Sequence, residues 1–251
     1  MLPPGFRHLQ LDETGSTNTE CLDLARAGEA GGLWVTARKQ LSGRGSRGRN
    51  WVSEPGNLYA SLLLDAPWPL ASLSQLSYVA SLALRDALIE AAAPFSTLPD
   101  FRLKWPNDVL ADGEKTAGIL LESHAVGDRR IVICGIGTNV RHYPSETLHP
   151  ATSLLEKGID TEPEILFSRL VRTFASRLLE WNGGDGFATT RRDWQDAAIG
   201  LGRKAKVVLP TRDGQRTIAG TLLGIDETGV MSMRREDGSV EKITTADIFF
   251  A

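Results

Sequence analysis

Cysteine is scarce in this 251-residue chain, which has only Cys21 and Cys134. The two lie far apart and show no metal-ligand spacing, which excludes a disulfide framework and a CxxC zinc site. Isolated cysteines are typical of reduced thiols in the cytosol. No apolar stretch approaches the roughly 18 residues that span a bilayer, and the first residues lack the segments of a signal peptide. We therefore expect a cytoplasmic protein without membrane contact.

An excess of charge of one sign is also missing. The chain carries 28 Lys and Arg against 31 Asp and Glu, so its formal net charge is −3. That balance argues against a generally basic nucleic-acid-binding surface, although it leaves room for a local basic patch. Hydrophobic residues make up 41% of the chain and charged residues 24%. Because these proportions are ordinary for a globular protein of this length, we expect a sizeable core.

Strand and helix patterns fill most of the first two hundred residues. Turn signals at Asp112-Gly113 and Gly127-Asp128 join strand-like segments over short distances, which favours antiparallel pairing. Apolar residues at helical spacing predict helices over residues 18–27, 73–92 and 163–181. Short apolar runs predict strands over 6–12, 33–39, 58–65, 101–105, 108–111, 115–123 and 129–135.

The sequence changes character near residue 200. Three tight-turn signals follow, at Arg212-Asp213-Gly214, at 226–229 and at 236–238. This spacing predicts a small all-β unit, a barrel, so we expect one domain over 1–200 and a second over 201–251. The expected strands are 206–209, 217–225, 230–234 and 240–244.

A loop rich in glycine and arginine covers residues 43–51, with the sequence Gly43-Arg44-Gly45-Ser46-Arg47-Gly48-Arg49-Asn50-Trp51. We call it the Gly/Arg loop. Its first seven residues include three glycines and three arginines. Glycine lets the backbone approach a ligand closely, exposed N–H groups form an anion nest, and arginine offers a planar donor fork. No Gly-Lys-Ser/Thr follows, and the glycine spacing is not the dinucleotide fingerprint. By itself the loop is compatible with a solvated turn, an RNA-binding patch or an anion site.

Three further segments combine polar residues with turns or strand ends. Lys104-Trp105-Pro106-Asn107-Asp108 crowds a cation and a carboxylate at a proline-fixed turn. Lys115 opens the mostly apolar segment 115–122, where its ammonium either points into a cleft or is solvated. The glycines of Gly135-Ile136-Gly137-Thr138-Asn139 indicate close backbone packing or ligand approach, with a strand-end bulge as the alternative.

Together, in this order after Ser16-Thr17-Asn18, the four segments resemble the motifs of biotin–protein ligases, which attach biotin to a lysine of a carrier protein. That family shows Ser-Thr-Asn, Gly-Arg-Gly-Arg-x-Gly-Arg-x-Trp, Lys-Trp-Pro-Asn-Asp, Lys-x-x-Gly-Ile-Leu-x-Glu and Gly-x-Gly-x-Asn. The match covers about residues 12–140. The resemblance implies an α+β fold: a mixed sheet flanked by helices, related to class II aminoacyl-tRNA synthetases, followed by a small SH3-like β domain.

The resemblance also implies a two-step reaction. The biotin carboxylate attacks the α-phosphate of Mg²⁺-ATP to give biotinyl-5′-adenylate and pyrophosphate, and the carrier lysine then displaces AMP. The implied partner is a biotin carboxyl carrier protein, such as an acetyl-CoA carboxylase subunit, and the implied state is a monomer or weak homodimer. Because two anions must be held together, the chemistry requires positioned cations and backbone donors, which the Gly/Arg loop, Lys104 and Lys115 can supply.

Individual residues take roles from the same resemblance. Lys115 is implied to contact the biotin carboxyl oxygen and the α-phosphate, with Arg44 and Arg47 as further catalytic residues. Asp108 is implied to face the Mg²⁺ ion. The implied biotin-binding residues are Ser16, Thr17, Asn18, Gln40, Gly43, Arg44, Gly45, Ser46, Lys115 and Gly118. The implied ATP- and adenylate-binding residues are Arg47, Arg49, Trp51, Lys104, Asn107, Asp108 and Asn139.

The chain departs from the family pattern at Ser46, where arginine is usual. We expect the adenylate to dissociate faster than from relatives that carry the arginine. Some relatives begin with a DNA-binding winged helix-turn-helix, but here the motifs start by Ser16, so we expect no DNA binding.

Two alternatives stay open: a lipoate–protein ligase with the same adenylation chemistry, and an RNA-binding module that stacks bases on Trp51, Trp105 and Tyr59.

The histidines show no ligand or triad spacing and receive no catalytic role, and four tryptophans are expected to pack in the core. These residues are His8, His124, His142 and His149, and Trp34, Trp68, Trp181 and Trp194.

Overall fold

The computed structural model describes residues 2–145, 147, 149–211, 214–244 and 246–250. Its helices are α1 (Thr17–Arg26), α2 (Leu76–Ala92), α3 (Pro163–Trp181) and α4 (Phe187–Ala197). The strands of the first 140 residues are β1 (Arg7–Thr14), β2 (Leu33–Gln40), β3 (Leu58–Asp65), β4 (Phe101–Lys104), β5 (Asp108–Ala111), β6 (Glu114–Val126) and β7 (Arg129–Thr138). The later strands are β8 (Lys204–Thr211), β9 (Gly214–Ile225), β10 (Met231–Arg235), β11 (Val240–Ile243) and β12 (Asp247–Phe250).

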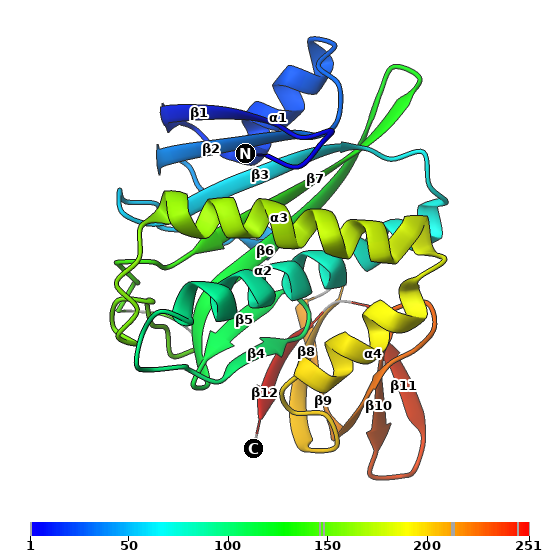
Figure 1. The fold of residues 1–251 in the computed structure, drawn as a ribbon. Coiled ribbons are helices and arrows are strands. Elements are labelled where there is room, and N and C mark those ends of the chain that lie inside the picture. Colours follow the sequence, from blue (N-terminus) through cyan, green and yellow to red (C-terminus); the bar gives the residue numbers. More distant parts are fainter. Residues whose placement is uncertain (1, 146, 148, 212–213, 245, 251) are drawn as a thin grey trace.

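These strands form two sheets (Figure 1). The larger sheet has the order β1-β2-β3-β7-β6-β5-β4, and the smaller has the order β11-β10-β9-β8-β12. β1 and β2 run parallel because α1 carries the chain back between them, whereas β2 and β3, like β6 and β7, are antiparallel neighbours. The larger sheet is therefore mixed, as the resemblance implied.

Apolar side chains cover both faces of the larger sheet. Successive residues of a strand point to opposite faces, and in β3 Leu62 and Leu64 join the main core, whereas Leu63 joins a second cluster beneath α1. Helices α2 and α3 lie side by side across the face of the main core (Figure 1). This two-sided burial explains why apolar residues occupy successive positions of β3, as at residues 62–64.

The structure confirms every strand and helix predicted by range, with ends that differ by no more than three residues. Among the α-helices and strands of the described residues, α4 and β12 were not predicted. Trp34, Trp181 and Trp194 are buried, and Trp68 packs edge-on against Trp181, so the predicted packing role of the tryptophans is confirmed. The turn predicted at Arg212-Asp213 lies outside the described residues. Among the described helices, none has both the length and the hydrophobicity to cross a bilayer.

Candidate active site

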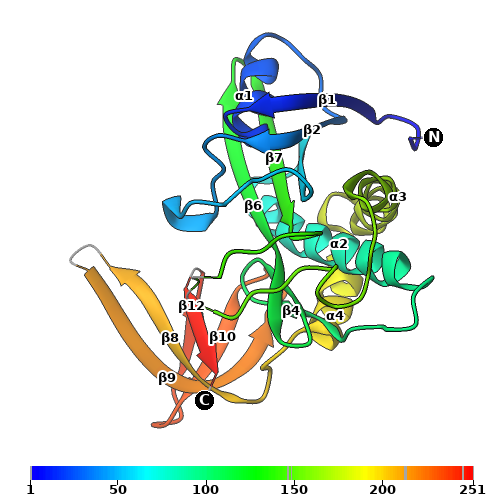
Figure 2. The ribbon, with the colours of Figure 1, turned by 90° about the vertical axis from the view of Figure 1, so that its left-hand side faces the viewer.

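A cavity of about 250 Å³ opens between the larger sheet, the Gly/Arg loop and β12 of the smaller sheet. In Figure 2 the Gly/Arg loop projects from the larger sheet on the side away from α2 and α3, toward β12. The structure places nearly all of the predicted site residues on the walls of this cavity, and only Gly43 and Arg47 of that set do not line it. Motifs spread from residue 16 to residue 139 thus meet in one place.

The start of α1 contributes one polar side of the cavity. Ser16 occupies the N-cap position, but its side chain makes no capping hydrogen bond. Instead, the Thr17 backbone N–H and Oγ1 donate to Gln40 Oε1 at 2.9 and 3.1 Å, and Gln40 Nε2 donates to Ser53 Oγ at 2.9 Å. The Gln40 amide therefore satisfies a free N–H of the first helical turn and ties α1 to the end of β2.

Asn18 is 4% exposed and has a partner on each side of its amide. Its Oδ1 accepts from Ser61 Oγ at 2.6 Å, and its Nδ2 donates to Glu122 Oε2 at 2.6 Å. Neither partner was predicted from the sequence, because Ser61 lies within an apolar strand pattern and Glu122 only closes a longer motif. We call the cavity-lining residues Thr17, Asn18 and Gln40, together with the buried Ser61 behind them, the polar wall.

The glycines of β6 and β7 leave room for side chains that lie flat against the strands. A Cβ added at Gly135 would lie 2.2 Å from Asn18 Oδ1. At Gly137 and Gly118 an added Cβ would lie 2.6 and 3.0 Å from the indole of Trp51. Because these contacts are too short for a side chain to fit without displacing its neighbour, the structure favours close approach over a bulge as the reason for these glycines.

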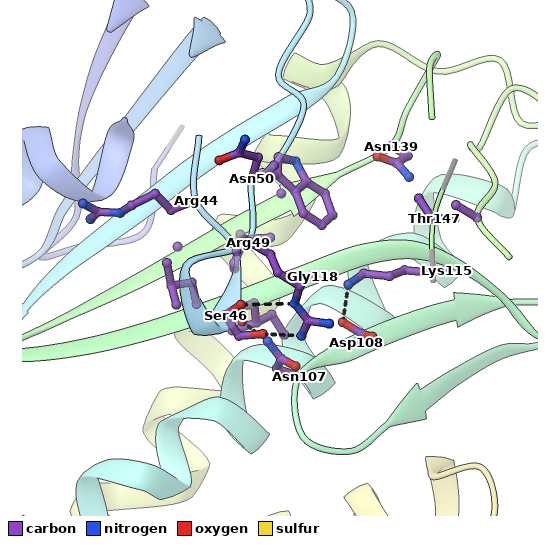
Figure 3. A pocket seen from close by; sticks show the side chains of 18 of the residues that line it. Arg44, Ser46, Arg49, Asn50, Asn107, Asp108, Lys115, Gly118, Asn139 and Thr147 are labelled. Carbon is purple, nitrogen blue, oxygen red and sulfur yellow. Dashed lines mark hydrogen bonds and ion pairs between the residues drawn. The ribbon is translucent and has the colours of Figure 1, made fainter. Parts of the chain in front are cut away.

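Two lysines bring positive charge to the cavity. Lys115 Nζ lies 2.6 Å from Asp108 Oδ1 and 5.3 Å from the centre of the Trp51 ring (Figure 3). Lys104 is 8% exposed and lies over Phe250, and burial lowers the pKa of its ammonium although the nearby Asp108 opposes that shift. The predicted cleft position of Lys115 is thus the one that the structure shows.

The arginines of the Gly/Arg loop bind acidic side chains from two distant parts of the chain. Arg44 Nη2 lies 3.4 Å from Glu122 of β6. Arg47 and Arg49 both reach Asp247 of β12, at 2.5 and 3.3 Å. No local pattern pointed to Asp247, because the contact joins residues two hundred positions apart.

The loop also has internal contacts. Arg49 Nη2 donates to Ser46 Oγ at 3.0 Å, as drawn in Figure 3. Arg47 adopts the left-handed conformation, with φ of 60°. Gly43 lies beside Trp51 and Ser53, where an added Cβ would approach both to 2.5 Å, so it shapes the loop although it does not line the cavity.

Two asparagines use their amide groups to fix backbone near the cavity. Asn107 Nδ2 donates to the Ile119 carbonyl at 2.7 Å, and Asn139 Nδ2 donates to the Thr152 carbonyl at 3.0 Å. His149, which received no role from the sequence, also lines the cavity and packs against Phe249 at 4.9 Å between ring centres. Burial lowers the pKa of His149, and the Lys104 ammonium lowers it further, although Asp108 opposes that shift.

The aromatic residues do not form a platform for RNA. Tyr59 and Trp105 are 1% and 5% exposed, and Trp105 Nε1 donates to Tyr78 Oη at 3.2 Å. The indole of Trp51 lies against the glycines of the cavity. Bases stack on exposed ring faces, so the structure does not favour the RNA-binding alternative.

The cavity offers few donors to a metal ion. In the described part of the chain, no three His, Cys, Asp or Glu side chains cluster in a way that could hold a metal ion. Mg²⁺ is commonly held by one or two carboxylates together with substrate phosphates. The Asp108 carboxylate on the cavity wall fits that mode.

Solved biotin protein ligases share this arrangement of a mixed sheet, a second antiparallel sheet and a pocket, which places the chain in that class of protein. The biotin protein ligase from Aquifex aeolicus in complex with biotin and ATP superposes with a TM-score of 0.80 at 29% identity, covering 98% of this chain and 99% of that one. A point mutant of the same protein in complex with biotin gives a TM-score of 0.82 at 28% identity, with 98% and 100% coverage.

Sequence comparison identifies the family. The model of the biotin/lipoate A/B protein ligase family matches residues 12–139, and this chain belongs to that family. The biotin–[acetyl-CoA-carboxylase] ligase of Paracoccus denitrificans is 38% identical over 96% of this chain and 99% of its own length. The enzyme of the same name from Mycobacterium tuberculosis is 33% identical over 90% of this chain and 82% of its own length.

Proposed function

We propose that this chain activates biotin with ATP as biotinyl-5′-adenylate and transfers the biotin to a lysine of a biotin carboxyl carrier protein. The observation that carries the proposal is the single cavity that joins a polar wall to a set of cations. The polar wall offers donors and acceptors for a ureido ring, and Lys104, Lys115 and Arg49 offer positive charge for a carboxylate and phosphates. The names of the relatives support the same activity.

In the first step, the Lys115 ammonium gives up its ion pair with Asp108 and contacts the biotin carboxylate oxygen and the α-phosphate instead. The ammonium holds the two anions in contact while negative charge builds up at phosphorus, which is electrostatic stabilisation by a positioned group. Arg44 and Arg47 complete the catalytic set, and Arg49 neutralises phosphate charge. Asp108 would hold Mg²⁺ together with the phosphates, and the ion would add positive charge there.

The remaining predicted residues surround the two substrates. Biotin is bound by Ser16, Thr17, Asn18, Gln40, Arg44, Gly45, Ser46, Lys115 and Gly118, with Gly43 contributing through the shape of the loop, and the ATP and adenylate contacts come from Arg47, Arg49, Trp51, Lys104, Asn107, Asp108 and Asn139. In the second step the carrier lysine attacks the mixed anhydride, from which AMP departs readily, whereas a free carboxylate would have to expel oxide. We assign residues 1–200 to a catalytic domain related to class II aminoacyl-tRNA synthetases and 201–251 to an SH3-like domain.

Biotin-dependent exchange between ATP and labelled pyrophosphate tests this function. We expect exchange with biotin and none with lipoate, because lipoate has no ureido group to occupy the polar wall. The second step is followed by mass spectrometry of a carboxyl carrier domain, whose mass should rise by one biotin. Exchange stimulated by lipoate and not by biotin would replace the proposal with a lipoate–protein ligase.

Ser46→Arg is expected to slow the release of the adenylate. The serine hydroxyl now accepts from Arg49, and a guanidinium in its place would add a charge-assisted contact to the adenylate phosphate. One such bond is enough to lengthen the residence time about tenfold. Release is measured by chasing bound radiolabelled adenylate with an excess of unlabelled adenylate. Ser46→Gln provides length without charge, and a residence time unchanged by Ser46→Arg would show that the existing arginines already hold the phosphate.

A further inference from the structure

A continuous chain of hydrogen bonds links the polar wall to both ends of the Gly/Arg loop. At one end Ser53 Oγ donates to the Trp51 carbonyl at 2.9 Å, and at the other Arg44 pairs with Glu122. Between them, the Thr17 backbone N–H donates to Gln40 Oε1 at 2.9 Å, the Thr17 and Ser61 hydroxyl oxygens lie 2.7 Å apart, and Ser61 Oγ donates to Asn18 Oδ1 at 2.6 Å. The members in order are Trp51, Ser53, Gln40, Thr17, Ser61, Asn18, Glu122 and Arg44.

Glu122 determines how the amide of Asn18 is oriented. An ionised carboxylate only accepts hydrogen bonds, so the atom of Asn18 that lies 2.6 Å from Glu122 Oε2 must be the Nδ2 donor. The Oδ1 acceptor is then directed to the Ser61 hydroxyl. A Cβ at Gly135 would lie 2.2 Å from Oδ1, so the glycine leaves the space that this amide occupies.

Glu122 also holds the Gly/Arg loop against the larger sheet. Both of its carboxylate oxygens lie 3.4 Å from Arg44 Nη2. The Arg44 side chain is 45% exposed, so this ion pair is weak compared with the Asn18 contact. Glu122 is not among the residues that line the cavity, whereas Asn18 and Arg44 are. Its direct contacts with the cavity lining therefore run through these two neighbours.

We propose that Glu122 is a positioning residue for adenylate formation: it fixes the Asn18 amide toward biotin and holds Arg44 at the rim of the same pocket. This inference rests on the proposed function. It assigns to the carboxylate a role in biotin affinity that is separate from its contribution to folding.

Three variants separate the two contacts. Glu122→Ala removes both partners, and we expect the Kd for biotin to rise about tenfold or more, as for loss of a hydrogen bond to a charged group. Glu122→Gln keeps a carbonyl acceptor for Asn18 but loses the charge that attracts Arg44, so its Kd should stay within about threefold of wild type. Glu114→Ala is the matched control, because Glu114 lies on the same strand. Its carboxylate lies 2.6 Å from Lys157 Nζ, and neither residue lines the cavity.

Biotin affinity is measured by calorimetry without ATP, and thermal unfolding is recorded for every variant. We expect Glu122→Ala to lose affinity, Glu122→Gln to restore it, and the KM for ATP to change little in either. Wild-type affinity in Glu122→Ala would overturn the inference. If both Glu122 variants lost the same biotin affinity and their unfolding temperatures fell by a matching amount, Glu122 would have a structural role alone. That result would also overturn the inference. If neither the wild type nor Glu114→Ala showed biotin-dependent exchange, that result would count against the proposed function instead.

Discussion

Lys115→Ala is expected to lower biotin-dependent ATP–pyrophosphate exchange by about 10²–10³-fold, the usual cost of removing one positioned electrostatic group from an active site. Lys115 is held at the cavity by Asp108 at 2.6 Å and by the face of Trp51. Its charge is needed most when the carboxylate and the α-phosphate share negative charge in the transition state. We therefore expect the loss mainly in kcat, with a smaller rise in the KM for biotin.

The control for this variant is Lys157→Ala, which also removes an ion-paired lysine. Lys157 contacts Glu114 and Asp112 and does not line the cavity. Exchange by Lys157→Ala should match wild type. Lys115→Arg should remain well below wild type, because a planar fork cannot replace a point charge between two anions. Substantial exchange in Lys115→Ala would remove Lys115 from the centre of the mechanism.

Gly135→Ala is expected to weaken biotin binding by about 10–100-fold, the range that corresponds to an overpacking cost of about 1–3 kcal/mol. The added methyl group would lie 2.2 Å from Asn18 Oδ1 and 2.9 Å from Asn18 Cγ. Asn18 is buried and bonded to both Ser61 and Glu122, so it can move only by breaking these contacts. The predicted result is a higher Kd for biotin with an almost unchanged KM for ATP.

A double-mutant cycle gives this prediction a strict test. In Asn18→Ala the side chain that meets the new methyl group is gone, so adding Gly135→Ala should cost little more. We expect strongly non-additive effects on biotin affinity, as for residues in direct contact. Additive losses would mean that Gly135 affects the pocket by a route other than Asn18.

Much of the pocket could be predicted from the sequence because its residues come in short motifs. Lys115, Asp108 and Asn139 each stand at a strand end or turn, and a resemblance in motif order was enough to bring them together. Asp247 and Ser61 could not be found in this way. Asp247 lies on a short terminal strand, and Ser61 lies in an apolar run where a single hydroxyl has no distinctive pattern.

The two missed elements have a common physical reason. Phe187 and Trp194 are the large apolar residues of α4, and most of its other residues are polar, so too few apolar residues mark the helix before it packs on α2 and α3. β12 is four residues long and becomes a strand by pairing with β8. Both elements depend on neighbours that are remote in sequence.

By itself, the amino-acid sequence determined the alternation of strands and helices, the β-rich character of the chain beyond residue 200 and the residue types that line the cavity, because these depend on local periodicity and on motifs. The tertiary structure alone decided that Glu122 faces Asn18, that Asp247 reaches the Gly/Arg loop, and that Gly135 and Gly137 leave room for Asn18 and Trp51. The reason is that a contact between residues up to two hundred positions apart is fixed by strand pairing and close packing, which no local pattern encodes.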